Sequence, residues 1–309
     1  MLIQTDLFGR THDKVINAIR RIQAFCPDDG YFLAFSGGKD SVVIKALCDM
    51  AGVKYDAHYN VTTVDPPELV RFIIAMYPDV MLDRPEMSMR QLIIHKQMPP
   101  TRLQRYCCEV LKERNGKGRV TMTGVRWAES MRRKTVHGTV TIFDGKAGAI
   151  ASEIIGARYA KNIRGGIVLN DDNDESRRMV EMCYRTSKTL VNPIIDWSDE
   201  DVWEFIRTYD VPYCSLYDEG WRRLGCVGCP LGGFAAQKRE FARWPVYRKL
   251  YTRAFDDMLL ARKRAGKVNR NRLWTDGDGV FRWWIGENQG DNPDQMCFED
   301  IGLEMEESI

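Results

Sequence analysis

Two patterns of apolar residues follow each other early in the chain. The run Tyr31-Phe-Leu-Ala-Phe35 is continuously apolar, which is typical of a short buried strand, and residues 42–50 carry apolar side chains at helical spacing. Residues 53–60 repeat the strand pattern, and residues 65–76 repeat the helix pattern. A strand, a helix and a second strand in this order predict a βαβ unit, and therefore an α/β fold with a parallel sheet.

Further elements are expected around this unit. Ser198 and Asp201 are spaced as an N-cap signal for a helix that runs to Ile206. Residues 135–180 are the least regular part of the chain, and we expect an inserted, partly mobile segment there. The other expected elements are a helix within residues 1–30, strands at 80–82 and 120–125, and a helix at 87–96.

The turn between the first strand and its helix carries candidate chemistry. It reads Ser36-Gly-Gly-Lys-Asp-Ser41, with Gly37, Gly38, Lys39 and Asp40 between the two serines. Glycines let a backbone curl and approach a ligand closely, and the N–H groups that begin a helix favour phosphate. The serine hydroxyls and the lysine ammonium add donors. The sequence therefore predicts a phosphate-binding loop, while the alternative is an ordinary turn made of common turn residues.

This loop resembles the pyrophosphate-binding loop of the adenine nucleotide α-hydrolase superfamily. From about Tyr31 to Trp244, the chain is most similar to the phosphoadenylyl-sulfate reductase family and to the iron–sulfur ATP pyrophosphatases of DNA phosphorothioation. The resemblance implies a doubly wound, mostly parallel Rossmann-like sheet with a C-terminal helical region. It also implies an adenine nucleotide, either ATP with Mg²⁺ or an adenylylated sulfate, at the carboxyl edge of the sheet.

Several polar residues follow the ends of other expected strands. In the family, a run of the form Gly-x-Arg-x-x-x-Ser-x-x-Arg contacts the nucleotide, and Gly124, Arg126, Ser130 and Arg133 match it. Arginines past the end of a parallel strand face the ligand crevice, where they would neutralise phosphate or sulfate. A basic first turn on a surface helix is the alternative. The segment with Asp65 and Glu68 differs from the sequence pattern that the reductases have at this position. A helix-capping role explains Asp65 at least as well as a ligand role.

Four cysteines form two short groups far apart in the chain. Cys107 and Cys108 are adjacent, and Cys226 and Cys229 form a C-x-x-C between glycines. Four thiolates in this arrangement suit a [4Fe–4S] cluster, because a cube of irons offers a separate corner to each thiolate. A Cys₄ zinc site, a redox disulfide and buried thiols are the alternatives. The same two cysteine groups are the cluster signature of adenylyl-sulfate reductases, which the chain resembles.

Charge is distributed unevenly, although the net charge is only +2. Residues 102–134 contain ten basic and three acidic residues, residues 220–272 contain fourteen and three, and residues 287–309 contain eight acidic residues and no basic one. The basic blocks are either solvated helix faces or surfaces that hold phosphates or a nucleic acid. We expect four parts: an N-terminal helix at 1–30, a nucleotide-binding α/β domain at 31–235, a basic helical region at 236–286, and an acidic tail at 287–309.

Two enzymatic functions follow from these residues. The favoured one is ATP-driven adenylation of an acceptor with release of pyrophosphate, followed by sulfur transfer. In it, Lys39, Arg126 and Arg133 stabilise charge, and either Asp40 or Ser41 lies near the metal. A nucleic acid is the candidate acceptor, and a protein such as a cysteine desulfurase is the candidate sulfur donor. The alternative is reduction of adenylyl sulfate or its 3′-phosphate to sulfite, for which Cys297 is the only late cysteine. A non-enzymatic nucleotide-binding protein is the third hypothesis.

The chain shows no run of 18 apolar residues and no leader pattern, so we expect a cytoplasmic protein without a membrane partner. Nine cysteines are compatible with that compartment if they are ligands or buried thiols. The sequence is compatible with an oligomer but does not set the oligomeric state.

Overall fold

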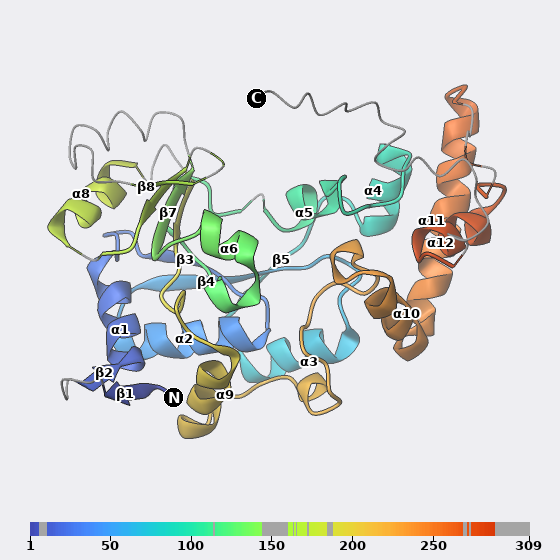
Figure 1. Ribbon diagram of the computed structural model, residues 1–309. Helices are drawn as coiled ribbons and strands as arrows, with labels where there is room; N and C mark the ends of the chain where they lie inside the picture. The colour runs from blue at the N-terminus through green and yellow to red at the C-terminus, as the bar shows by residue number, and fades with distance from the viewer. Residues whose placement is uncertain are drawn as a thin grey trace, which may run out of the picture. The chain divides into compact units, whose positions relative to one another are not determined.

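The computed structural model (Figure 1) describes most of the 309-residue chain, and its contacts divide the chain into two compact units. The first unit contains Met1–Val61, Asp65–Arg84 and Leu111–Gly225, and the second contains Thr62–Val64, Pro85–Val110 and Cys226–Ile309. The domain boundaries expected from the sequence stay a prediction. The described residues are 1–5, 11–113, 115–143, 160–162, 164, 166–171, 173–183, 188–267, 271 and 273–287.

The centre of the first unit is a mixed sheet in which the described strands have the order β5-β4-β3-β6-β10-β7-β9-β8. Strands β5, β4, β3, β6 and β10 are parallel to one another, whereas β7, β9 and β8 continue the sheet with antiparallel pairing. Along the chain, β4 is added beside β3 and β5 beside β4. The chain then returns, and β6 pairs with the other side of β3. The doubly wound, mostly parallel α/β fold is thereby confirmed, with its switch point between β3 and β6.

The strands of this sheet are short. Their bounds are β3 (Tyr31–Ala34), β4 (Tyr55–Asn60), β5 (Met81–Asp83), β6 (Thr121–Met122), β7 (Val140–Phe143), β8 (Ala160–Lys161), β9 (Ile167–Leu169) and β10 (Lys188–Val191). The helical elements of the first unit are α1 (Lys14–Ala24), α2 (Lys39–Ala51), α3 (Pro67–Met76), η1 (Trp127–Glu129), α6 (Met131–Val136), α8 (Asp174–Cys183), α9 (Asp199–Thr208) and η3 (Ser215–Tyr217).

Helix α2 is the buried helix of this unit, and it packs against both α1 and α9 (Figure 1). Its side chains Val42, Val43, Ile44 and Leu47 are all fully buried, which explains why apolar residues occupy more than one face of the helix. The helix ends at Gly52, which has a φ of 65°, in the left-handed conformation that glycine adopts most readily. The position of α2 therefore fixes the loop that precedes it.

One expectation for the first unit was wrong in detail, and a second stays a prediction. Residues 1–30 are not one helix, because Ile3–Thr5 (β1) and Thr11–Asp13 (β2) form an antiparallel pair, and α1 begins only after Asp13. The Asp13 carboxylate accepts hydrogen bonds from the N–H groups of Val15 and Ile16 and so caps the helix. Within the expected insertion at 135–180, the described residues contain β7, β8, β9 and α8, and the strands extend the sheet.

Helix caps were predicted with mixed success. The Ser198 and Asp201 capping box before α9 is confirmed, because each side chain bonds the other residue's backbone N–H. Asp65 does not cap α3, since the N-cap is Pro66 and no side chain accepts a capping hydrogen bond there. Asp65 is instead a buried residue.

The second unit is a helical assembly with an aromatic core. Its helical elements are α4 (Met89–Lys96), α5 (Tyr106–Leu111, all but its last residue), η4 (Pro230–Gly232), α10 (Phe234–Arg243), α11 (Pro245–Arg264) and α12 (Gly277–Trp284). The long helix α11 packs on α4, α10 and α12. The rings of Phe241, Tyr251, Phe255, Phe281 and Trp284 contact one another at this junction.

Two remaining sequence expectations concern the membrane and the tail. Among the residues that the structure describes, no helix combines the length and the apolar character needed to cross a bilayer. The expected acidic tail at 287–309 lies, apart from its first residue, outside the described residues.

Candidate functional site

The predicted phosphate loop lies where the sheet changes direction. Residues Ser36–Gly38 follow β3 directly and lead into α2, whereas Gly124 and Arg126 follow β6, the neighbouring strand across the switch point. Ligands of doubly wound sheets bind in the crevice outside the carboxyl ends of the strands at this point. The structure therefore brings two segments that are far apart in sequence to the expected ligand edge.

The two glycines Gly37 and Gly124 are required by close packing. Gly37 has a φ of 69°, and a Cβ atom there would lie 2.7 Å from Ile73 Cδ1 on α3. A Cβ atom on Gly124 would lie 2.8 Å from the Cβ of Asp40. Any side chain at Gly124 would push the exit of β6 away from the start of α2. These glycines thus hold the loop, α3 and the β6 exit together.

Hydrogen bonds within the loop fix its shape. The Ser41 hydroxyl donates to the Gly38 carbonyl over 2.9 Å and accepts from the Ser36 N–H over 3.2 Å. The Ser36 hydroxyl lies 3.2 Å from the same Ser41 oxygen. Gly38, the N-cap of α2, offers no side chain to the first N–H groups of the helix. The Lys39 N–H donates instead to the Tyr217 hydroxyl over 2.8 Å. The loop is thus pre-organised around a helix start.

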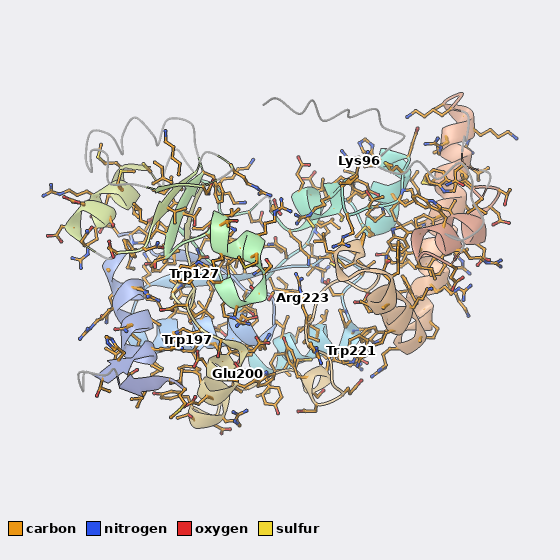
Figure 2. The ribbon with its side chains drawn as sticks, viewed as in Figure 1. Lys96, Trp127, Trp197, Glu200, Trp221 and Arg223 are labelled. Atoms are coloured by element: carbon orange, nitrogen blue, oxygen red, sulfur yellow. The ribbon has the colours of Figure 1, made fainter. Side chains whose placement is uncertain are left out.

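Arg126 is buried at the centre of a charged cluster. Its side chain is 1% exposed, and it donates to Asp40 Oδ1 over 2.7 Å, to Asp199 Oδ1 over 2.5 Å and to the Trp197 carbonyl over 3.2 Å. Trp197 lies just before α9 (Figure 2). Although burial lowers the pKa of Arg126, the charges of Asp40 and Asp199 raise it overall. Arg126 is therefore permanently charged, and its main contacts are to protein carboxylates.

Lys39 completes this cluster. Its side chain is buried, and its Nζ lies 3.4 Å from Asp199 Oδ1 and 3.7 Å from Asp40 Oδ2. Burial opposes ionisation of Asp199, but the hydrogen bond from Arg126 and the charge of Lys39 lower its pKa overall. Two cations and two carboxylates thus balance one another beside the loop. A phosphate that reached Lys39 would compete with Asp199, which is 62% exposed.

Arg133 and Ser130 lie on the segment that follows Arg126. Ser130 is the N-cap of α6 and accepts a hydrogen bond from the Arg133 N–H over 3.3 Å. The Arg133 guanidinium forms an ion pair with Glu129. Burial and the nearby positive charges of Arg223 and Arg126 lower the pKa of Arg133, against the opposing effect of Glu129. The structure therefore gathers Arg126, Arg133 and Arg223 into one positive region of the first unit.

Sequence reasoning missed three residues of this region. Asp199, Tyr217 and Arg223 (Figure 2) all follow β10, more than 150 residues after the loop. The segment with Asp199 carried only a helix-capping signal, and Tyr217 and Arg223 belonged to no local motif. The residues that were predicted for the nucleotide site all lie at the loop, at the β6 exit or at the start of α6.

The four predicted cysteine ligands gather in the second unit. Burial raises the pKa of Tyr251, and the nearby thiols of Cys226, Cys107 and Cys229 act in the same direction. A hydrogen bond between the Cys107 thiol and Cys108 raises the pKa of Cys107, and burial and the charges of the other three cysteines raise it further. Within the described ranges, no group of three His, Cys, Asp or Glu side chains is arranged to hold a metal ion.

The loop from Cys226 to Cys229 is held by its backbone. The Val227 N–H donates to the Val64 carbonyl over 2.8 Å, and the Val227 carbonyl accepts from the Tyr251 hydroxyl over 3.1 Å. The Gly228 N–H donates to Glu240 over 2.6 Å. Gly228 has a φ of 78°, and a Cβ atom there would lie 2.5 Å from Phe241. The loop is thus fixed to the aromatic core independently of its thiols.

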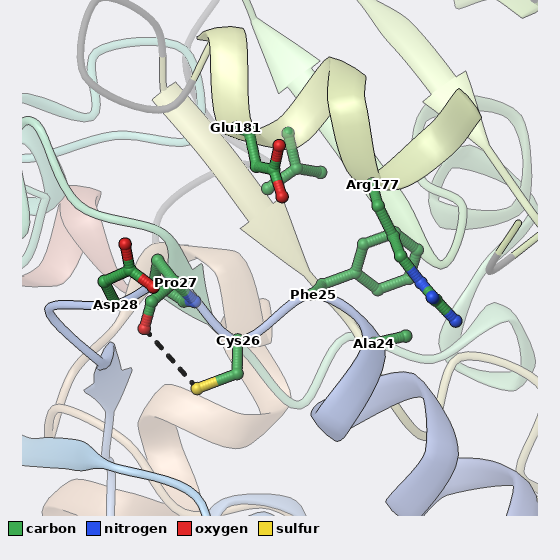
Figure 3. Close-up of a pocket in the computed structure, with 8 residues that line it drawn as sticks. Ala24, Phe25, Cys26, Pro27, Asp28, Arg177 and Glu181 are labelled. Atoms are coloured by element: carbon green, nitrogen blue, oxygen red, sulfur yellow. Dashed lines mark hydrogen bonds between the residues drawn. The ribbon is translucent and has the colours of Figure 1, made fainter. Parts of the chain in front are cut away.

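A surface pocket of about 310 Å³ lies elsewhere in the first unit, and none of the predicted site residues lines it (Figure 3). The Cys26 thiol in this pocket donates to the Pro27 carbonyl over 3.6 Å. Burial raises the pKa of Cys26, and it also raises the pKa values of Cys48 and Cys214. None of these three thiols is activated as a nucleophile.

His137, which follows α6, gives a prediction for pH dependence. Burial lowers its pKa to about 4, and the positive charges of Arg133, Arg164 and Lys188 act in the same direction. The unfolded chain takes up this proton near pH 6.5 and the folded chain only near pH 4, so stability falls as the pH drops through this window. Between pH 7 and pH 5, we expect the protein to lose about 2 kcal/mol more unfolding free energy than a His137→Leu variant. Urea unfolding at both pH values measures this, and equal losses in the two proteins would refute it.

Comparison with known proteins identifies the relatives of this chain. The family model for the phosphoadenosine phosphosulfate reductase domain matches residues 30–231, which is more than half of the chain. An uncharacterized protein of Methanocaldococcus jannaschii is 25% identical over 289 residues, covering 90% of this chain and 58% of that protein. The adenosine 5'-phosphosulfate reductase of Staphylococcus haemolyticus is 28% identical over 78 residues, covering 25% of this chain and 28% of that enzyme.

A third relative and two solved structures complete the comparison. The adenosine 5'-phosphosulfate reductase of Neisseria meningitidis serogroup A is 42% identical over 53 residues, covering 17% of this chain and 22% of that enzyme. The chain thus spans less than two thirds of the length of each of these three relatives. A phosphoadenylyl-sulfate reductase of Candida auris has a TM-score of 0.38 and 15% identity, over 67% of this chain and 87% of that one. An FMN adenylyltransferase of Candida glabrata, solved with FMN and an ATP analog, has a TM-score of 0.41 and 13% identity, over 69% and 63%.

Proposed function

This chain belongs to the phosphoadenosine phosphosulfate reductase family, and we propose that it binds ATP at the loop Ser36–Ser41 and releases pyrophosphate by adenylating an acceptor. A nucleophilic oxygen of the acceptor attacks the α-phosphorus, and the bond from that phosphorus to the bridging oxygen of the β-phosphate breaks. A sulfur nucleophile then takes the place of the activated oxygen, and AMP leaves. The observation that carries this proposal is the pre-organised loop at the switch point of the sheet.

The residues of the first unit have separate roles in this proposal. The loop N–H groups and Lys39 hold the β- and γ-phosphates, and Arg133 stabilises the charge that develops as pyrophosphate leaves. Asp40 is the carboxylate next to the loop, and it would hold the Mg²⁺ that accompanies ATP. Gly124 and Ser130 line the same edge through the β6 exit and the α6 cap.

Arg126 acts in this proposal as a positioning residue. Its burial and its three hydrogen bonds to Asp40, Asp199 and Trp197 leave it less able than Arg133 to meet a phosphate directly. It instead fixes the direction of the Asp40 carboxylate and ties the start of α2 to the segment before α9. The role proposed from the sequence, direct contact with phosphate, is replaced here by this indirect one.

The cysteine group supports a [4Fe–4S] cluster as the cofactor, with Cys107, Cys108, Cys226 and Cys229 as its ligands. There are four thiols, and a [4Fe–4S] cluster has four irons that can each bind one of them. A single zinc ion would need all four sulfur atoms about 2.3 Å from one point, and the two adjacent cysteines make that harder than binding to separate irons. When bound, the cluster would supply a place to carry the sulfur. Zinc stays the alternative that a metal analysis distinguishes.

Exposed basic side chains of α11 support a nucleic-acid acceptor. Lys249, Arg253, Lys263 and Arg264 are exposed, whereas the acidic side chains of this helix turn to partners within the second unit. Asp257 binds Arg90 over 2.5 Å, and Asp256 accepts from the Gly277 N–H over 2.6 Å. Such a surface attracts a phosphate backbone. A protein that carries a persulfide, such as a cysteine desulfurase, is the proposed sulfur donor.

Sulfite formation from adenylyl sulfate or its 3′-phosphate is the second candidate function, and the named reductases among the relatives favour it. That reaction needs a thiolate that attacks sulfur. The raised pKa values of Cys26, Cys48 and Cys214 make these thiols poor nucleophiles. The remaining candidate outside the cysteine group and Cys183 is Cys297, which lies outside the described residues.

Product analysis of the anaerobically purified protein separates the two functions. With ATP, Mg²⁺ and a nucleic acid as the acceptor we expect release of pyrophosphate, and with adenylyl sulfate, thioredoxin and dithiothreitol we expect no sulfite. Lys39→Ala should lower pyrophosphate release at least about tenfold, because it removes a cation from the phosphate site. Lys54→Ala, at an exposed lysine outside the loop, is the control and should keep wild-type activity. Sulfite without pyrophosphate would establish the reductase instead.

A further inference from the structure

Tyr217 touches the phosphate loop from a distant part of the chain. It is the last residue of η3, and its hydroxyl accepts the Lys39 N–H over 2.8 Å. A Cβ atom added to Gly38 would lie 3.4 Å from the same hydroxyl, so the hydroxyl borders both loop residues. The Lys39 N–H is the first N–H of α2, which is the type of donor that binds phosphate at a helix start. Tyr217 therefore occupies a position where a phosphate oxygen would bind.

The Tyr217 hydroxyl can still donate a hydrogen bond to a ligand. Among the described residues, the Tyr217 O–H has no acceptor, although a phenol can both accept and donate. Burial raises the pKa of Tyr217, against the opposing effect of the Lys39 N–H, so the hydroxyl stays protonated. The ring is held by an edge contact with Trp203, with ring centroids 5.2 Å apart. A fixed ring thus presents an unused donor beside the loop.

The charges around Tyr217 favour a ligand with several negative oxygens. Arg223 (Figure 2) is exposed and forms no ion pair with any carboxylate in the described part of the chain. It lies close enough to both Arg133 and Tyr217 to affect their pKa values. Two guanidinium groups near one another repel unless an anion lies between them. The Lys39 N–H and the Tyr217 hydroxyl therefore border a site for a polyanion, and the positive charges of Arg133 and Arg223 act near it.

We propose that Tyr217 and Arg223 are polyphosphate ligands of this loop. A phosphate oxygen accepts the hydrogen bond of the Lys39 N–H in place of the Tyr217 hydroxyl. The Tyr217 hydroxyl then donates a hydrogen bond to the same phosphate group, and Arg223 forms an ion pair with the neighbouring phosphate group. Neither residue changes its covalent state. The inference rests on the proposed function, because it takes the phosphates of ATP and pyrophosphate as the ligand.

Calorimetric titration of the full chain with inorganic pyrophosphate, and separately with adenosine, tests this proposal. Tyr217→Phe keeps the ring and removes only the hydroxyl, and we expect it to weaken pyrophosphate binding about tenfold, because hydrogen bonds to charged groups are strong. Adenosine binding should not change. The matched control is Tyr213→Phe, because Tyr213 contacts the same Trp203 ring but donates to Asp218 over 3.0 Å. It should bind both compounds as the wild-type protein does.

A second pair of variants tests Arg223. Arg223→Met should weaken pyrophosphate binding severalfold, whereas Arg222→Met, at the exposed neighbour, should not. Unchanged affinity in Tyr217→Phe and Arg223→Met would overturn the proposal, and tighter binding by Tyr217→Phe would make Tyr217 a competitor of phosphate instead of a ligand. Absence of pyrophosphate and ATP binding in the wild-type protein would overturn the proposed function, and this inference with it.

Discussion

Replacing Arg126 by methionine is expected to lower the free energy of unfolding by about 2–3 kcal/mol and to reduce pyrophosphate release at least about tenfold. The variant loses the hydrogen bonds to Asp40, Asp199 and the Trp197 carbonyl, and it leaves the two carboxylates with Lys39 alone as the nearby cation. Removal of one partner from a fully buried pair costs about 3–5 kcal/mol. The expected loss is smaller here because Asp199 is 62% exposed and water can reach its carboxylate.

Urea unfolding and pyrophosphate assays on the wild-type protein and three variants test this expectation. Arg132→Met is the matched control, since Arg132 is an exposed residue of the same segment and should tolerate the change within about 0.5 kcal/mol. Adding Asp199→Asn to Arg126→Met should restore part of the lost stability, because it removes one of the two repelling charges. A wild-type unfolding midpoint for Arg126→Met would refute the central role of this cluster.

The phosphate loop could be predicted from the sequence because its chemistry is local. Ser36 to Ser41 are contiguous, and the strand before them and the helix after them have clear apolar patterns. Gly124 was within reach for a similar reason, because it follows a strand whose carboxyl end meets the same edge of the sheet. In both cases the backbone pattern alone places the residue near the ligand edge.

Partners that approach this loop from afar could not be predicted. The contact between Tyr217 and Lys39 spans 178 residues, and that between Arg126 and Asp199 spans 73 residues. Nothing in the local spacing of Tyr217 or Asp199 distinguishes them from ordinary turn and capping residues. The same reason explains why Arg126 was expected to meet phosphate directly, since its two carboxylate partners come from distant segments.

The antiparallel part of the sheet was missed for a different reason. Strands β8 and β9 contain two and three residues, which is too short for a periodic pattern to appear. Strand β9 joins the sheet by pairing with Val140–Phe143, and β8 joins it by pairing with β9, and such pairing is a tertiary effect. The second unit is likewise built from distant segments, because Pro85–Val110 joins Cys226–Ile309 through the packing of α4 on α11.

The separate exchange of Cys226 and Cys107 for serine is expected to remove most of the iron that the wild-type protein binds after anaerobic reconstitution. A [4Fe–4S] cluster corresponds to about four irons and four sulfides per chain, and loss of one thiolate leaves an iron without its ligand. Burial and the neighbouring cysteines raise the pKa of Cys107, so binding must displace protons from these thiols. Iron uptake should therefore increase as the pH rises.

Iron, zinc and sulfide contents of the purified proteins decide this prediction. Cys26→Ser is the matched control, because Cys26 is a half-buried thiol whose hydrogen bond to the Pro27 carbonyl a serine hydroxyl can also make. It should bind iron as the wild-type protein does. The Cys226 variant should keep its fold, because hydrogen bonds to the Val64 carbonyl and the Glu240 carboxylate and from the Tyr251 hydroxyl hold the loop through its backbone. Unchanged iron in both variants would exclude these cysteines as ligands, and one zinc without sulfide in the wild-type protein would replace the cluster with a zinc site.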